Sequence, residues 1–409
     1  MKSIFFSIVP VLLLISCTTN QKPTLKQGAF YTEEQGKAEL KKLESMYSTK
    51  DGWEKRKQLL RTSILEGINL SPLPARTPLN TVISSKRIHD GYSVENVSFE
   101  SIPGFYVCGN LYRPLDNSKT HPAILCPHGH FDGDSLGASG RFRPDQQKRC
   151  ATFARMGAVV FSYSMFGWAE SSQQLDSTAV IEKPDFKLIS KIHGIPLALT
   201  MQTWNSMRIL DFLETLSDVD MSKIAITGAS GGGTQTFLLA ALDDRIAVSV
   251  PVVMVSCHFF GGCGCESGLP IHQSAKHFTN NAEIASMIAP KPMLLISDGA
   301  DWTKNEPTVE YPFIKRTYSF YNAENNVENV HFPTGVHDYG YAKRVPVYGF
   351  MAKHLGLNLQ AVTDQSGTID ETQSALERAE DMLVFSSKNP YPASALKGAE
   401  AIQSALKKY

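Results

Sequence analysis

A serine lies in a glycine-rich turn between two contrasting segments. Residues 223–236 read KIAITGASGGGTQT, so Ser230 follows Gly228 by two positions and precedes three consecutive glycines that begin at Gly231. The apolar pattern before the serine predicts a strand, and the pattern after it predicts a helix. Glycines let backbone segments approach closely. A serine in a Gly-x-Ser-x-Gly turn between a strand and a helix is typical of an exposed nucleophile.

A serine hydroxyl is a weak nucleophile, so a base and an orienting acid are expected elsewhere. Asp298 and Asp301 follow the next strong strand pattern, and His337 follows the last one. This is the order serine, acid, histidine. We expect His337 to take the proton of Ser230 and Asp301 to orient the imidazole. Asp298 remains the alternative acid, although its place at the strand end suits a turn. His331 falls inside the strand pattern and is expected to pack there.

Two backbone N–H groups are candidates for holding the negative oxygen of a tetrahedral intermediate. One belongs to Gly231, which is expected at a helix N-terminus, where partial positive charge favours an anion. The other belongs to His130 in the sequence PHGH, which follows an apolar strand pattern. A tight turn without a catalytic purpose is the alternative for His130.

Strand and helix patterns alternate from about residue 82 to residue 357. Two strand patterns in close succession, 92–101 and 105–114, predict an antiparallel pair. Short apolar runs separated by helical patterns then predict an α/β fold with a doubly wound, mostly parallel sheet. The runs are 121–128, 157–164, 223–230, 246–253, 291–298 and 329–335. Ligands gather at the carboxyl ends of such strands, which is where the candidate residues lie.

The chain of 409 residues divides into four expected parts. They are a signal segment at 1–17, a helical extension and linker at 18–81, the α/β domain at 82–357 and a helical appendix at 358–409. Within the appendix, amphipathic patterns predict helices at 370–385 and 394–409.

The first seventeen residues have the pattern of an export signal. Lys2 precedes twelve almost wholly apolar residues, and the sequence LISC then ends at Cys17. This resembles the lipobox of bacterial lipoproteins, in which the cysteine is acylated. We therefore expect a chain exported to the bacterial cell envelope and attached to the membrane only through lipid on Cys17. An ordinary secretory signal is the alternative.

The charge balance argues against nucleic acid as a partner. Forty basic residues match forty acidic ones, and no basic run is present. Apolar residues make up 42% of the chain and charged residues 20%, which is typical of a globular protein.

Residues 257–278 are rich in cysteine and histidine. Their spacing matches none of the usual zinc patterns, so a loop disulfide or simple packing is expected, and neither a metal nor an organic cofactor is expected. The segment is predicted to form a lid or pocket wall, with a structural insertion as the alternative. Candidate pocket residues there and near other strand ends are Glu266, His258, Trp302 and Trp168.

Ser230, Asp301 and His337, together with PHGH and VCGNLYRP, resemble α/β-hydrolases of the dienelactone hydrolase and acetyl xylan esterase type. The resemblance covers residues 82–357. It implies a serine carboxylic-ester hydrolase that acts through an acyl-enzyme, on acetylated or otherwise esterified carbohydrate. Relatives often carry an aspartate where this chain has Ser164. Glucuronoyl esterases usually carry arginine where this chain has Gly231, which counts against that substrate.

Two other functions are compatible with the same residues. A peptidase of the prolyl-oligopeptidase type shares the triad, but a long propeller domain would be expected before the hydrolase region. A carbohydrate-binding lipoprotein that has lost activity would keep the fold, and the complete triad argues against it.

Overall fold

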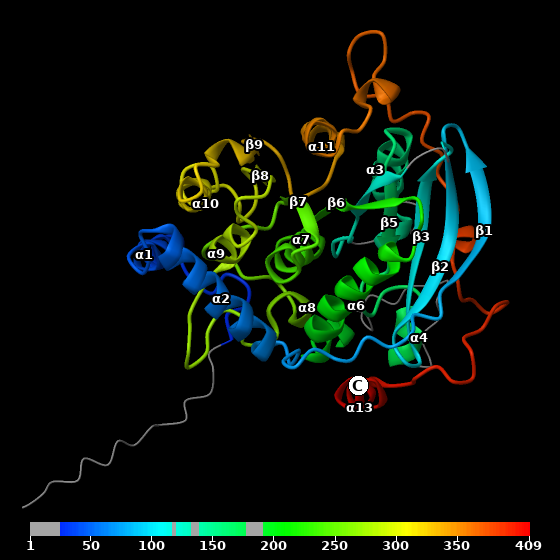
Figure 1. Cartoon of the computed structure of the whole chain (residues 1–409), viewed down its shortest axis with the longest axis horizontal. Helices are drawn as coiled ribbons and strands as arrows, with labels where there is room; N and C mark the ends of the chain where they lie inside the picture. The colour runs from blue at the N-terminus through cyan, green and yellow to red at the C-terminus, as the bar shows by residue number, and fades with distance from the viewer. Residues whose placement is uncertain (1–24, 117–119, 132–138, 177–190) are drawn as a thin grey trace, which may run out of the picture.

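A nine-stranded sheet forms the centre of the computed structural model, which describes residues 25–116, 120–131, 139–176 and 191–409. The strand order is β1-β2-β3-β5-β4-β6-β7-β8-β9 (Figure 1). The strands are β1 (Val82–His89), β2 (Tyr92–Ile102), β3 (Phe105–Pro114), β4 (His121–Leu125), β5 (Val159–Tyr163), β6 (Val219–Ala229), β7 (Ile246–Val252), β8 (Met293–Asp298) and β9 (Val327–Phe332). The signal segment and Cys17 lie outside the described residues.

The sheet has an antiparallel part and a parallel part. Strands β1, β2 and β3 pair antiparallel, and β3 continues antiparallel onto β5. The remaining pairs, from β5 through β4 and β6 to β9, are all parallel. The predicted mostly parallel α/β sheet is confirmed. Parallel pairing puts the carboxyl ends of β4, β6, β8 and β9 at one edge, where every candidate catalytic residue follows a strand.

Helices cover both faces of the sheet. The longer ones are α1 (Glu33–Glu44), α2 (Lys50–Gly67), α3 (Pro144–Arg155), α6 (Leu197–Glu214), α7 (Gly231–Leu242), α10 (Glu310–Ser319), α11 (Tyr341–Leu355) and α13 (Ala399–Lys408). The shorter ones are α4 (Ser171–Leu175), α8 (Gly264–Ser267), α9 (Asn281–Ser286) and α12 (Ala379–Met382). Helices α6 and α7 pack into one apolar core, and α3 and α11 pack into a second core. In the described residues, no helix is long and apolar enough to cross a membrane.

The N-terminal helices α1 and α2 lie beside α9 and α10 (Figure 1). A buried ion pair between Arg56 of α2 and Glu283 of α9, with 2.8 Å between nitrogen and oxygen, ties them to the main domain. These two helices lie within the extension that the sequence predicted to be helical.

The C-terminal segment is less helical than predicted. Within residues 370–385 only Ala379–Met382 is helical, whereas α13 forms within the predicted range 394–409. Instead, buried side chains form hydrogen bonds with the backbone N–H and carbonyl groups of this segment. The Asn110 amide donates to the carbonyl of Met382 at 2.9 Å, and the N–H of Val384 donates to Glu170 at 3.0 Å. These tertiary hydrogen bonds override the amphipathic pattern, because a longer helix would use the same groups internally.

Candidate active site

Ser230 occupies a strained turn between β6 and α7. The strand ends at Ala229 and the helix begins at Gly231, while Ser230 itself has φ 54° and ψ −124°. Positive φ is unfavourable for a residue with a side chain, so such strain persists only where surrounding contacts impose it. The Ser230 N–H donates to the carbonyl of Val252 on β7 at 3.1 Å, which helps to hold the turn. The result is a partly exposed serine at the carboxyl end of β6.

The glycines around Ser230 allow close backbone approach. A Cβ atom built on Gly228 or on Gly232 would lie 2.5 Å from the carbonyl oxygen of Pro127. Real Cβ contacts are essentially never below 3.0 Å. The turn is therefore pressed against the loop that follows β4, and only glycine fits at these two positions.

The His130 imidazole covers Gly231. A Cβ atom on Gly231 would lie 2.4 Å from Cε1 of His130. The histidine ring thus occupies the space that a side chain at position 231 would need. This explains why the chain has glycine here: an arginine at this position would displace His130.

His337 and Asp301 form a direct pair. Nδ1 of His337 lies 2.6 Å from Oδ2 of Asp301, and the side chain of Asp301 is only 3% exposed. The other oxygen of Asp301 accepts from the N–H and the hydroxyl of Thr303, both at 2.6 Å. The Trp302 ring lies 4.6 Å from the imidazole, centroid to centroid. The carboxylate and the indole together fix the orientation of a partly exposed histidine.

Asp298 has a different partner. Its carboxylate is fully buried and contacts the ammonium group of Lys343 on α11 at 2.8 Å. It also accepts from the N–H of Ala300 at 3.1 Å, which shapes the turn after β8. His331 remains on β9, where its Nδ1 lies 2.9 Å from the hydroxyl of Ser297. The structure therefore brings Asp301, and neither Asp298 nor His331, to His337.

Gly231 follows the serine directly, and the loop that carries His130 packs against the same turn. Among the described residues, no hydrogen bond uses the N–H of Gly231 or of His130, and none uses the hydroxyl of Ser230. The Phe131 ring, next to His130, lies 5.6 Å from the His337 ring. The loop after β4 thus contacts both the turn around Ser230 and the candidate base, His337. In enzymes without bound substrate, the hydrogen bond between the nucleophile and its base is often long.

Glu266 is a buried carboxyl group near these residues. Burial raises its pKa to about 7, while the backbone N–H groups of Gly262 and Cys263 and the charge of His337 act in the opposite direction. One oxygen accepts from Gly262 at 2.6 Å, and the other lies 3.9 Å from Nδ1 of His130. Of the predicted pocket residues, Glu266 and Trp302 are therefore close to the candidate catalytic groups.

Trp168 borders the candidate site through His130, whereas His258 lies away from it. The Trp168 ring is buried and stacks on His130, with 6.1 Å between centroids and 18° between planes. His258 contacts Ser256 through Nδ1 at 3.0 Å, and its Cβ lies against Gly36 of α1. In the described residues, no hydrogen bond or ring contact joins His258 to Ser230, Asp301 or His337.

Two residues that shape the site were not predicted. His193 precedes α6 and packs edge-on against His130 at 4.6 Å between centroids. Lys343 lies on α11 and neutralises Asp298. Neither residue belongs to a spacing motif, so only the folded chain shows their role.

Comparison with known proteins places these observations in a family. Residues 157–265 match the family described as "Glucuronyl esterase, fungi". The solved structure of the methylesterase BT1017 is similar with a TM-score of 0.81 and 39% identity, covering 92% of this chain and 80% of that one. The chain belongs to the esterases of this methylesterase's family. The predicted α/β-hydrolase fold and hydrolase activity are confirmed, so the esterase is neither the peptidase nor the inactive binding protein that the sequence left open.

Two curated relatives are more distant from the esterase. YtaP of Bacillus subtilis (strain 168), a protein named as a hydrolase, is 26% identical over 283 residues, which is 63% of this chain and 87% of the relative. The 4-O-methyl-glucuronoyl methylesterase 1 of Wolfiporia cocos (strain MD-104) is 26% identical over 157 residues, which is 31% of this chain and 37% of the relative. The range of the family match, residues 157–265, includes Ser230 and Gly231.

Proposed function

We propose that the esterase hydrolyses a methyl ester on the carboxyl group of a sugar acid, through a Ser230–His337–Asp301 triad and an acyl-enzyme. The observation that carries this proposal is the 2.6 Å contact between His337 and Asp301 at the same sheet edge as the strained Ser230. A histidine oriented by a buried carboxylate is the base that a serine nucleophile requires.

In the acylation step, the Ser230 oxygen attacks the ester carbonyl carbon while Nε2 of His337 takes the hydroxyl proton. Nδ1–H of the resulting imidazolium donates to Asp301, whose negative charge stabilises it. The N–H groups of Gly231 and His130 hold the oxygen that becomes negative in the tetrahedral intermediate. The imidazolium then protonates the leaving methoxy group, methanol departs, and the sugar acid remains as an ester of Ser230.

In the deacylation step, His337 removes a proton from water, and the hydroxide adds to the acyl carbon at the same oxyanion site. Collapse of this second intermediate returns the proton to Ser230 and releases the sugar carboxylate. The products balance as one methanol and one carboxylic acid for each ester and water consumed.

The choice of a methyl ester among the esterified carbohydrates that the sequence suggested rests on relatives. Two relatives are named as methylesterases, and the matched family is named for glucuronyl esters. In a methyl ester of a sugar acid, the sugar lies on the acyl side of the scissile bond. Trp302 lies beside His337, and Phe259 stacks on its ring with 3.8 Å between centroids.

The decisive experiment compares leaving groups. Purified esterase is incubated with methyl-esterified uronic-acid oligosaccharides and with acetylated xylan oligosaccharides, and methanol and acetate are measured. We expect methanol release that is lost in Ser230→Ala and retained in Ser222→Ala, an exposed serine near the other end of β6. Faster acetate release would move the substrate class to acetyl esters, and full turnover by Ser230→Ala would overturn the mechanism.

We also propose that lipid on Cys17 attaches the esterase to the bacterial cell envelope. The support is the sequence LISC after a twelve-residue apolar run. Cell fractionation of Cys17→Ala should move the protein from the membrane fraction to a soluble fraction. Unchanged membrane association would contradict this proposal.

A further inference from the structure

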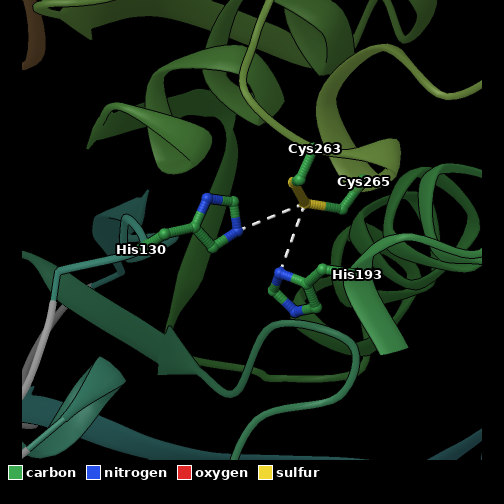
Figure 2. A group of neighbouring side chains, drawn as sticks. All are labelled: His130, His193, Cys263 and Cys265. Atoms are coloured by element: carbon green, nitrogen blue, oxygen red, sulfur yellow. Dashed lines mark hydrogen bonds between the residues drawn. A yellow bond between two sulfur atoms is a disulfide. The ribbon is translucent and has the colours of Figure 1, made fainter. Parts of the chain in front are cut away.

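We propose that His130, His193, Cys263 and Cys265 form a zinc site once the disulfide between the two cysteines is reduced. This proposal is independent of the proposed substrate. Figure 2 shows both imidazoles pointing at the Cys263–Cys265 pair. The four residues come from the loop after β4, the segment before α6 and the start of α8, so one ion would join three separate parts of the chain.

The four ligand atoms already converge. All of them lie within 4.8 Å of one another. Nε2 of His130 is 3.2 Å and Nδ1 of His193 is 3.4 Å from Sγ of Cys265. Around a tetrahedral zinc with ordinary bond lengths, ligand atoms are separated by about 3.3–3.8 Å. Two imidazoles and two thiolates are also a donor set that zinc prefers over magnesium or calcium.

A backbone carbonyl orients the ring of His193. Nε2 of His193 lies 2.8 Å from the carbonyl oxygen of Phe166, which can only accept, so Nε2 carries the hydrogen and Nδ1 carries a lone pair. Nδ1 of His130 lies 3.9 Å from a carboxylate oxygen of Glu266, which is beyond hydrogen-bond distance. The carbonyl partner of His193 is of the kind that metal-binding histidines use.

The disulfide leaves Nδ1 of His193 without a donor. A disulfide sulfur carries no hydrogen, so the lone pair of this nitrogen faces an atom that cannot donate to it. His193 and Cys265 are buried, which makes unmet acceptors costly. A cation bound to both thiolates would satisfy all four groups at once.

The conversion needs a dithiol reductant. The reductant transfers two electrons and two protons to the Cys263–Cys265 bond, which yields two thiols and leaves the reductant as a disulfide. Zinc binding then releases the two thiol protons and forms two zinc–sulfur bonds. Four protein ligands close the coordination sphere, so this zinc would be structural and would carry no reactive water. Because His130 covers Gly231, the ion would fix the wall beside Ser230.

The first measurement is the zinc content of the whole chain in its two redox states. Reduced protein is mixed anaerobically with zinc chloride, freed of excess metal by gel filtration and measured by elemental mass spectrometry. We expect about one zinc per reduced chain and none per oxidised chain. Zinc should also protect Cys263 and Cys265 from alkylation in peptide mapping of the unmutated protein, a readout that needs no variant.

The matched variants test which residues hold the ion. The double variant Cys263→Ser/Cys265→Ser and the single variant His193→Asn should lose at least tenfold in zinc affinity. Cys257→Ser should not, because Cys257 is a nearby buried cysteine that belongs to a separate cluster with His258 and Glu310. Reduced protein without zinc, or zinc that persists in the double variant, would overturn the site. Loss of zinc in Cys257→Ser alone would place the ion in that other cluster.

Discussion

At the scale of single residues, the loop after β8 gives two similar carboxylates different tasks. Asp301 faces an imidazole and is oriented by Thr303, whereas Asp298 balances the charge of a buried lysine. Both side chains are almost fully buried, so burial does not distinguish them. Their partners distinguish the two aspartates, because the carboxylate of Asp298 is paired with Lys343 and cannot also stabilise a histidine elsewhere.

The two aspartates should therefore respond differently to the same change. Asp301→Asn should lower kcat by about 10⁴, because the amide cannot stabilise the imidazolium and favours the wrong tautomer. Asp298→Asn should instead destabilise the fold by about 1–3 kcal/mol, because Lys343 loses its buried partner and keeps only the half-exposed Asp338. Ester hydrolysis and thermal unfolding of both variants check this. The assignment would have to be exchanged if Asp298→Asn folded normally and lost its turnover.

Gly231 should tolerate no side chain. In Gly231→Ala the new methyl group would lie 2.4 Å from Cε1 of His130, so the imidazole must move away from the turn around Ser230. We expect kcat to fall at least tenfold, since a small misplacement of oxyanion donors is costly. Gly349→Ala on α11 is the matched control, because nothing lies within 4 Å of its Cβ position. Normal turnover of Gly231→Ala would show that this close contact is not needed.

At the scale of elements, the C-terminal segment around α12 is held by buried charge. Arg141 and Glu170 form a two-pronged ion pair at 2.6 and 2.7 Å, and both side chains are fully buried. The same groups bind the segment, since Arg141 donates to the Met382 carbonyl and Glu170 accepts from the Val384 N–H. Ser164 contacts both charged groups. The position where relatives often have aspartate is thus part of this network.

Removing the charge of Glu170 should loosen this segment. Glu170→Gln leaves Arg141 as a buried cation without its partner, at a cost of about 3 kcal/mol. Glu380→Gln is the control, because its pair with Arg378 is largely exposed and contributes little. Thermal unfolding and hydrogen exchange over residues 379–385 measure the effect. Equal melting temperatures for the two variants would contradict the anchoring role.

At the scale of the whole molecule, folding buries a histidine that cannot easily take up charge. His272 is 1% exposed, and its Nε2 lies 2.7 Å from the amide oxygen of Asn281. Burial lowers the pKa of His272 to about 3. The folded chain therefore keeps this imidazole neutral across the range in which an unfolded chain would protonate it.

This difference predicts acid sensitivity. Since the unfolded pKa is about 6.5, the unfolded chain binds the proton first, and stability is lost as the pH falls from about 6.5 toward 3. His272 alone should cost about 2 kcal/mol at pH 5. Denaturant unfolding at pH 7.5 and pH 5 measures it, and His272→Gln should reduce the difference by that amount. A variant with an unchanged difference would show that other groups control the acid response.

Local patterns in the sequence determined the fold class and the order of the catalytic candidates. Apolar runs and helical periodicity depend on neighbours in the chain, so they predict strands, helices and the serine turn directly. The glycines around Ser230 also predict the turn directly, because glycine allows two backbone segments to approach each other closely. His337 could be chosen over His331 because one follows a strand and the other lies inside it.

Only the tertiary structure decided which distant groups meet. The pairing of Asp298 with Lys343, the contact of His130 with Gly231 and the approach of His193 to Cys265 join residues from separate elements. Most of segment 370–385 is not helical for the same reason. Asn110 of β3 and Glu170, just before α4, form hydrogen bonds with its backbone groups. Periodicity reports which face of an element is apolar, whereas a polar contact depends on where the folded chain brings its partner.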